Sequence, residues 1–366
     1  MSRFPQPLRG KRILDLSRYL PGPYATRQLQ AHGAEIIKVE HPKGGDPLRT
    51  ISPVLFEDLN RGKKSIAIDL RVDSARLLDL AASVDAVIDG FRPGYLDRLG
   101  IGAAQMQAQN PALVWCGLSG FGLSGPYQNR AAHDMATLAM AGFYSAPSSV
   151  SGRISRPNVR LADLEAGNKA ALAVTMALWE ADQTGKGALI DVSMFDCVAA
   201  MAAPMAMASP ANGDIHDMWQ VMADSDLYQT ADGHSIALAT LEDKFWAAFA
   251  GAAQDIAPAL SEPRFATRSG RDADKPALAA LIAGAVAQLT LAQWTSRLEA
   301  VDSCWGPVLT GQKILDDRHV IARDLINAET GHVAFPVMVN GVREPAGMAA
   351  PALGADTAEI LAIHKP

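Results

Sequence analysis

The sequence contains only three cysteines in 366 residues, and no two of them form a Cys-x-x-Cys pair. Cys116, Cys197 and Cys304 are widely spaced and odd in number. This pattern argues against a disulfide framework and against a structural zinc site. We therefore expect three buried, small apolar side chains and no bound metal.

A surplus of positive charge and a long apolar run are also missing. The chain has 33 Lys and Arg against 39 Asp and Glu, a net charge of -6 that argues against a protein built to coat nucleic acid. No uninterrupted apolar stretch reaches the length of a membrane span, and residues 1–9 lack the apolar core of a signal peptide. We expect a cytoplasmic protein with no nucleic-acid and no membrane partner.

Residues 1–125 alternate short β-rich segments with amphipathic helical ones, in a chain that is 49% hydrophobic and 20% charged. Alternating strands and helices are typical of a parallel sheet covered on both faces, so we predict a doubly wound α/β domain. The predicted strands are residues 12–16, 35–40, 65–69, 86–89 and 112–116, and the predicted helices are residues 24–30, 73–83 and 95–100.

Three glycines after the last of these strands, Gly120, Gly122 and Gly125, formally fit the dinucleotide-binding pattern G-x-G-x-x-G. Pro126 follows at once, no helix is predicted to begin there, and no acidic residue ends a strand about 20 positions later. We interpret the segment as a glycine-rich loop rather than an NAD site.

The rest of the chain predicts a second, smaller domain and a return to the first. Residues 144–158 are rich in Ser, Pro and Gly and predict a loop, and Pro204, Pro210 and Asn212-Gly213 indicate a linker. Two short strands around Asp232-Gly233 predict a hairpin that opens the smaller domain. The other predicted elements are helices at 164–181, 194–207, 243–251, 274–288 and 291–299, a strand at 188–192, a hairpin at 335–343 and a final helix.

His133, Asp163 and Glu242 are the candidate catalytic residues. An imidazole and a carboxylate can act as two bases on opposite faces of one carbon, while a second carboxylate fixes the tautomer of the imidazole. Each residue also has a structural interpretation: a histidine at a loop–helix junction, an N-cap for Asp163, and a first-turn acid for Glu242. The surrounding segments decide between the two interpretations.

Those segments, with many others in the same order, resemble the class III CoA-transferase and racemase superfamily. The resemblance runs through the N-terminal half and on to the end of the chain. It is carried by Arg12-Ile-Leu-Asp-Leu-Ser17, Pro21-Gly-Pro23, Gly33-Ala-Glu-Ile-Ile-Lys-Val-Glu40, Gly44-Gly-Asp46-Pro, Leu59-Asn60-Arg61-Gly-Lys63-Lys64-Ser65, Phe91-Arg92-Pro93-Gly94, Ser119-Gly-Phe-Gly122, Thr184-Gly185-Lys186-Gly187, Asp232-Gly233 and Ala350-Pro351-Ala-Leu-Gly354.

The resemblance implies an α/β fold with a Rossmann-like large domain built from both chain ends, a smaller α+β domain, and an interlocked homodimer. It places the large domain at residues 1–204 and 331–366, the small domain at 226–309, and linkers at 205–225 and 310–330. The active site would lie between the large domain of one subunit and the small domain of the other.

An acyl-CoA substrate is also implied, with coenzyme A entering as part of the substrate and no permanently bound cofactor. CoA carries phosphates, so a negatively charged protein needs a local basic patch, which Arg61, Lys63, Lys64 and Arg92 could supply. Without the resemblance, the same run of cations reads equally well as a solvated turn. The residues implied to bind CoA are Asn60, Arg61, Lys63, Lys64, Asp69, Leu70, Arg71, Phe91 and Arg92.

Two chemistries occur on this implied scaffold. In the racemase branch, which resembles alpha-methylacyl-CoA racemase, a His-Asp segment, an Ala-Asp segment and a Glu-x-x-Phe segment carry the machinery. His133-Asp134, Ala162-Asp163 and Glu242-Asp-Lys-Phe245 match all three. We therefore expect a racemase that inverts the α-carbon of a 2-methyl-branched or related acyl-CoA through an enolate, stabilised by backbone N–H groups near the start of the helix of Asp163.

A CoA-transferase is the alternative, in which Asp163 would attack the thioester and form a mixed anhydride and then an enzyme–CoA thioester. A binding-only protein is a third possibility. It stays open because the chain departs from the family pattern: Leu164-Glu165-Ala166-Gly167 stands where glycines commonly follow the catalytic aspartate, and Ser148-Ser-Val-Ser-Gly152 replaces a glycine loop.

Overall fold

The computed structural model describes residues 4–144, 149–152, 154–209, 213–311, 313–327, 329–344 and 347–362. The chain divides into two compact units. Unit 1 comprises Met1–Phe143, Pro157–Ala202 and Arg318–Pro366, and unit 2 comprises Tyr144–Arg156 and Ala203–Asp317. Part of the predicted loop at 144–158, and Pro210 and Asn212 of the predicted linker, lie outside the described residues.

A six-stranded parallel sheet forms the centre of unit 1 and confirms the predicted α/β class. Its order is β3-β2-β1-β4-β5-β6, so the chain winds outward in one direction from β1 and in the other from β4. Ligands of such sheets bind beyond the carboxyl ends of the strands at this reversal. The strands are β1 Arg12–Leu16, β2 Glu35–Glu40, β3 Lys64–Ala67, β4 Ala86–Asp89, β5 Val114–Ser119 and β6 Leu189–Ser193.

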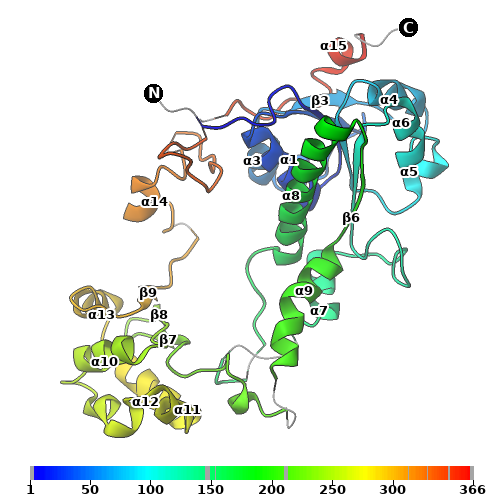
Figure 1. Ribbon diagram of the computed structural model, residues 1–366. Helices are drawn as coiled ribbons and strands as arrows, with labels where there is room; N and C mark the ends of the chain where they lie inside the picture. Colours follow the sequence, from blue (N-terminus) through cyan, green and yellow to red (C-terminus); the bar gives the residue numbers. More distant parts are fainter. Residues whose placement is uncertain are drawn as a thin grey trace. The chain divides into compact units, whose positions relative to one another are not determined.

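Helices cover both faces of this sheet (Figure 1). Helices α4 Ser74–Ala81, α5 Tyr95–Arg98 and α6 Ala103–Gln109 pack on one face, where Leu77, Leu80 and Met106 are fully buried among strand residues. Helix α1 Pro21–Ala31 packs against α8 Leu161–Thr184 on the other. Small residues allow this close approach: a Cβ atom on Gly167 of α8 would lie 2.7 Å from the carbonyl oxygen of Pro21.

The C-terminal segment returns to the edge of the sheet at β3. Helix α15 Thr357–Ala362 buries Ile360 in the core of unit 1, and the Asp356 carboxylate accepts a 2.7 Å hydrogen bond from the Ser65 N–H. The hairpin predicted at 335–343 is wrong, because a single antiparallel bridge, Val339 to Val342, forms there instead of two strands. The other elements of this unit are α2 Leu48–Ile51, α3 Pro53–Asn60, α7 Asp134–Met140 and α14 Arg318–Ala322, and α9 Met194–Met207 begins in it.

Unit 2 has an antiparallel sheet of order β7-β8-β9, and its first two strands confirm the predicted hairpin around Asp232-Gly233. Trp246, Phe249 and Trp294 are buried in its core. Its elements are β7 Leu227–Gln229, β8 Ser235–Leu238, β9 Trp305–Pro307, α10 Asp243–Ala252, α11 Arg268–Asp272, α12 Lys275–Val286 and α13 Leu291–Leu298, with 3₁₀ turns at Ile215–Asp217, Pro258–Ser261 and Pro263–Phe265.

Two expectations from composition concern membrane-spanning helices and the burial of the cysteines. Among the described residues no single helix is long and apolar enough to cross a membrane; α12 and α13 reach that threshold only as a pair bent by 105°. Their apolar side chains, such as Ile282 and Leu298, belong to the core of unit 2. Cys116 is buried as expected, but Cys304 is exposed in the loop before β9, so that part of the burial prediction is wrong.

Candidate active site

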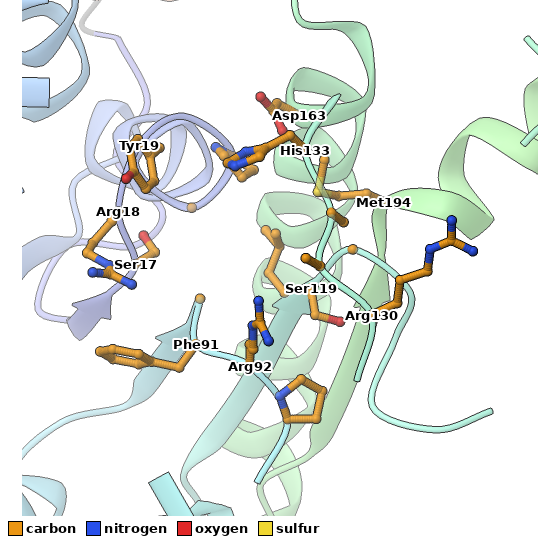
Figure 2. Close-up of a pocket in the computed structure, with 18 of the residues that line it drawn as sticks. Ser17, Arg18, Tyr19, Phe91, Arg92, Ser119, Arg130, His133, Asp163 and Met194 are labelled. Carbon is orange, nitrogen blue, oxygen red and sulfur yellow. The ribbon is translucent and has the colours of Figure 1, made fainter. Parts of the chain in front are cut away.

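A cavity of about 330 Å³ opens at the carboxyl ends of β1, β4 and β5, at the reversal of strand order. The chain leaves each of these strands through a loop that lines the cavity, and the starts of α7 and α8 complete it (Figure 2). All of these residues belong to unit 1. The lining residues are Ser17, Arg18, Tyr19, Pro21, Gly22, Gly90, Phe91, Arg92, Pro93, Leu118, Ser119, Gly120, Gln128, Arg130, Ala131, Ala132, His133, Asp163 and Met194.

Asp163 is the one carboxylate among these lining residues. It lies in the first turn of α8, where Arg160 holds the N-cap position, so the N-cap interpretation of Asp163 is wrong. Burial, with a contribution from the neighbouring Asp134 carboxylate, raises the pKa of Asp163 to about 7. A carboxyl group with such a pKa can both accept and donate a proton near neutral pH.

Asp134 ties the starts of α7 and α8 together. Its Oδ1 atom accepts a 2.8 Å hydrogen bond from the Ala162 N–H and a 3.4 Å bond from the Asp163 N–H. Asp134 is the first residue of α7, and this contact therefore brings the adjacent His133 to the same cavity as Asp163. Asp134 also accepts hydrogen bonds from two backbone N–H groups that were expected to stabilise an enolate oxygen. An enolate in this cavity would therefore have to be stabilised by other donors.

His133 stands at the N-cap position of α7 with an exposed side chain. Its imidazole meets the ring of Tyr19 edge to face, with the ring centres 6.4 Å apart and the planes at 89°. Figure 2 shows His133 and Asp163 at the same side of the cavity, with Tyr19 beside the imidazole. The structure thus brings together two of the three predicted catalytic residues.

Three arginines give the cavity a positive lining. Arg18 follows β1, Arg92 follows β4, and Arg130 precedes α7. Arg18 stacks over the Phe91 ring at 5.4 Å, and Arg130 stacks over Tyr127 at 5.7 Å. Within the described residues none of the three guanidinium groups forms an ion pair with a carboxylate, which leaves their charges available to an anionic ligand.

A second cavity of about 170 Å³ lies next to the first, beyond the carboxyl ends of β1, β2 and β3. The two cavities share Ser17, Arg18 and Phe91. An elongated ligand could therefore occupy both along the carboxyl edge of the sheet.

Comparison with known proteins decides the family. The model of CoA-transferase family III matches residues 8–357. A succinyl-CoA--D-citramalate CoA-transferase of Chloroflexus aurantiacus is 33% identical over 88% of this chain and 84% of its own. An acetyl-CoA:oxalate CoA-transferase of Acetobacter aceti is 32% identical over 93% of this chain and 90% of its own.

The chain belongs to CoA-transferase family III. A crystal structure of a CaiB/BaiF family protein from Brucella suis superposes with a TM-score of 0.86 at 29% identity, covering 99% of this chain and 100% of the other. The resemblance read from the sequence motifs is therefore confirmed at the level of the superfamily.

Four residues predicted to bind CoA line the second cavity. Asp69, Leu70 and Arg71 follow β3, and Phe91 reaches across from the loop after β4. The Arg71 guanidinium pairs with the Asp69 carboxylate at 3.3 Å, and hydrogen bonds from Arg71 hold the pKa of Asp69 below its usual value. Arg92 lines the first cavity instead. The CoA role of all five in this family III protein stays a prediction.

The other predicted CoA residues, Asn60, Arg61, Lys63 and Lys64, line neither cavity. They lead into β3 at its amino end, which faces away from the carboxyl edge. Lys63 is buried and donates to the Asp15 carboxylate at 3.0 Å, and buried Arg61 donates to the Val333 carbonyl at 2.6 Å. Two cations of the predicted basic patch are thus held inside the fold, while Arg92 lines the first cavity; the CoA role of these four residues stays a prediction.

Glu242 lies in unit 2, at the N-cap position before α10, and its side chain makes no capping hydrogen bond there. His133 and Asp163 lie in unit 1. The role of Glu242 therefore stays the one that the family resemblance implies.

The sequence analysis did not single out Arg18, Tyr19 and Arg130 as cavity residues, nor Asp134 as the residue that joins the starts of α7 and α8. The rule that parallel sheets bind ligands beyond their carboxyl ends could have singled out Arg18 and Tyr19, which follow the predicted strand 12–16. No local signal marks Arg130, because the long loop after β5 carries it back to the cavity.

Proposed function

We propose that the protein is a CoA-transferase that moves CoA from one carboxylic acid to another, with Asp163 as the nucleophile. One observation carries this proposal: Asp163 is the one carboxylate in a cavity lined by the three arginines, at the ligand-binding edge of the sheet. A nucleophile partly shielded from water, beside groups that attract anions, suits chemistry between two carboxylates and a thioester.

The proposed reaction exchanges acyl partners without any resident cofactor, since CoA arrives and leaves with the substrates. The Asp163 carboxylate attacks the thioester carbonyl. A C–O bond forms, the C–S bond breaks, CoA departs as the thiolate, and the acyl group stays on Asp163 as a mixed anhydride. The thiolate then attacks the Asp163 carbonyl, releasing the first acid and forming an enzyme–CoA thioester. The second acid attacks that thioester, which releases CoA thiolate and forms a second mixed anhydride with Asp163. The thiolate then attacks the carbonyl that came from the second acid, which forms the new acyl-CoA and releases the Asp163 carboxylate.

We further propose small dicarboxylic acids as the acids exchanged. In the names of the two relatives the free acids, D-citramalate and oxalate, are dicarboxylic; of the thioesters, succinyl-CoA derives from a dicarboxylic acid and acetyl-CoA from a monocarboxylic one. While one carboxylate of such an acid reacts at Asp163, its second carboxylate needs a cationic partner, and Arg18, Arg92 or Arg130 could pair with it.

A racemase is the second candidate, supported by a separate observation. His133 and Asp163 line the same cavity, and burial raises the pKa of Asp163 to about 7, which suits a group that removes and returns a proton. In this function the two side chains would serve opposite faces of the α-carbon of a 2-methylacyl-CoA.

One assay in D₂O distinguishes the two functions. The protein is incubated with succinyl-CoA or a 2-methylacyl-CoA, with and without oxalate, D-citramalate or other small dicarboxylic acids. A transferase forms a new thioester only when an acceptor acid is present, and Asp163→Asn abolishes it. Deuterium at the α-carbon without an acceptor, and no transfer in any pair, would support the racemase and refute the transferase.

We also propose that the active protein is a homodimer in which Glu242 of one subunit supports His133 of the other. This proposal rests on the family resemblance and on the location of the two residues in different units. A glutamate that accepts a hydrogen bond from the imidazole would fix its tautomer. The other ring nitrogen of His133, which lines the same cavity as Asp163, would then donate a hydrogen bond to the thioester carbonyl oxygen while Asp163 attacks.

A further inference from the structure

The backbone of Tyr19 is strained. Among the described residues only three non-glycine residues have a positive φ: Tyr19 at 63°, Asp324 at 47° and Asn340 at 52°. Asp and Asn tolerate the left-handed region because their short polar side chains can bond locally, whereas a bulky aromatic residue rarely adopts it. Strain of this kind persists only where the surroundings enforce it, and it is concentrated at functional sites.

Buried charges enforce it here. The Tyr19 N–H donates to the Asp46 carboxylate at 3.2 Å, and Asp46 pairs with Lys38 at 2.9 Å. Lys38 and Asp46 are 0% and 1% exposed, and the Lys38 ammonium also donates to the Ser17 carbonyl at 3.0 Å. The loop from Ser17 to Tyr19 is therefore held by a buried ion pair, whose two charges are costly to separate.

This anchored backbone presents the Tyr19 ring to the active site. Tyr19 is 41% exposed and lines the cavity with Asp163, and its ring meets the His133 imidazole edge to face. Edge-to-face aromatic pairs have a preferred geometry, so the ring restricts how the imidazole can turn. Figure 2 shows Tyr19 on the side of His133 away from Met194.

We propose that Tyr19 is a positioning residue, whose strained and anchored backbone holds its ring against His133 and so orients the imidazole toward the cavity. The effect on the rate of CoA transfer rests on the proposed function, whereas the contact itself does not. Tyr19 is proposed to act through its contact with His133.

Two substitutions test the proposal. Tyr19→Gly removes the ring but accepts a φ of 63° without strain. We expect its thermal midpoint to be no lower than that of the wild type, while kcat for CoA transfer falls on the order of tenfold to a hundredfold and KM for the thioester changes little. Tyr19→Phe keeps the ring and should restore most of the rate. Asn340→Gly, at an exposed left-handed position outside the cavity, is the matched control and should leave kcat unchanged.

A double mutant shows whether Tyr19 acts through His133. If it does, His133→Ala with Tyr19→Gly should be no slower than His133→Ala alone. Losses that multiply would overturn the proposal, as would a Tyr19→Gly protein with the wild-type kcat.

Proton NMR of the imidazole tests the contact without any activity. The His133 signal, identified by its absence in His133→Ala, should shift in Tyr19→Gly, because the ring current is lost, and stay in place in Tyr19→Phe. An unchanged signal in Tyr19→Gly overturns the proposal. If the wild type shows no CoA transfer at all, the proposed function fails, and this signal alone decides the role of Tyr19.

Discussion

At the scale of single residues, the two neighbouring carboxyl groups of Asp134 and Asp163 have different tasks. Asp134 is buried and accepts the N–H groups at the start of α8, so it holds structure together. Asp163 makes no capping bond and faces the cavity. Burial raises the pKa of Asp163 to about 7, with Asp134 as a second cause, which links its protonation to the stability of the fold.

The sign of that linkage gives a prediction. An unfolded aspartate has a pKa of about 3.9, so the folded protein binds this proton more tightly than the unfolded chain. The contribution of Asp163 to stability is therefore fully present below about pH 4 and is lost as the pH rises through about 7. We expect Asp163→Asn to become more stable relative to the wild type across this window, as measured by urea denaturation at several pH values.

Asp89, whose pKa is also raised to about 7 by burial, is present in both proteins and therefore cancels in the difference. A stability difference that stays constant from pH 4 to pH 8 would mean that Asp163 titrates as an exposed aspartate.

At the scale of elements, the alternation of short β-rich segments with amphipathic helical ones predicted the sheet. Residues 12–16, 35–40 and 86–89 are strands with the predicted bounds, and both α8 and α9 were expected. Helix α3, Pro53–Asn60, was not predicted. It is short, and it leads directly into the cationic segment 61–64, which was interpreted as a CoA-binding segment. The hairpin at 335–343 was predicted from an Asn-Gly turn. Only Val339 and Val342 pair through the backbone there, and Phe335 is bonded instead by the side chains of Arg343 and Glu344.

The candidate site was predicted as far as its residues lie in recognisable segments. His133 and Asp163 come together because Asp134 joins the starts of two helices, and that contact spans 28 positions in sequence. Lys63 shows the opposite case: its position in a cationic run suggested phosphate binding, yet the Asp15 carboxylate binds it in the interior. Burial of a charge depends on a distant partner, which no local pattern reports.

At the scale of the whole molecule, the proposed dimer predicts that two impaired variants can restore activity to each other. Asp163→Ala and Glu242→Ala each spoil both sites of a homodimer. If Glu242 acts on the partner's site, mixed dimers formed by unfolding and refolding the two variants together contain one intact site and one doubly altered site. We expect the mixture to recover about a quarter of the wild-type activity when subunits exchange at random, a value that follows from the statistics of a symmetric dimer.

Refolding each variant alone is the control, and neither should exceed its own activity before unfolding. A mixture that stays inactive while sedimentation shows mixed dimers would place Glu242 in the same subunit's site or outside it. A folded and active monomer would refute the proposed dimer.

The central claim, that Asp163 is a nucleophile that becomes acylated, is tested most directly by trapping. The protein is incubated with the thioester that it turns over in the presence of hydroxylamine, digested, and analysed by mass spectrometry. We predict a hydroxamate on the peptide that contains Asp163, formed only when the thioester is present and lost together with CoA transfer in Asp163→Asn. An unmodified Asp163 peptide from a sample that is actively turning over the thioester would contradict the claim.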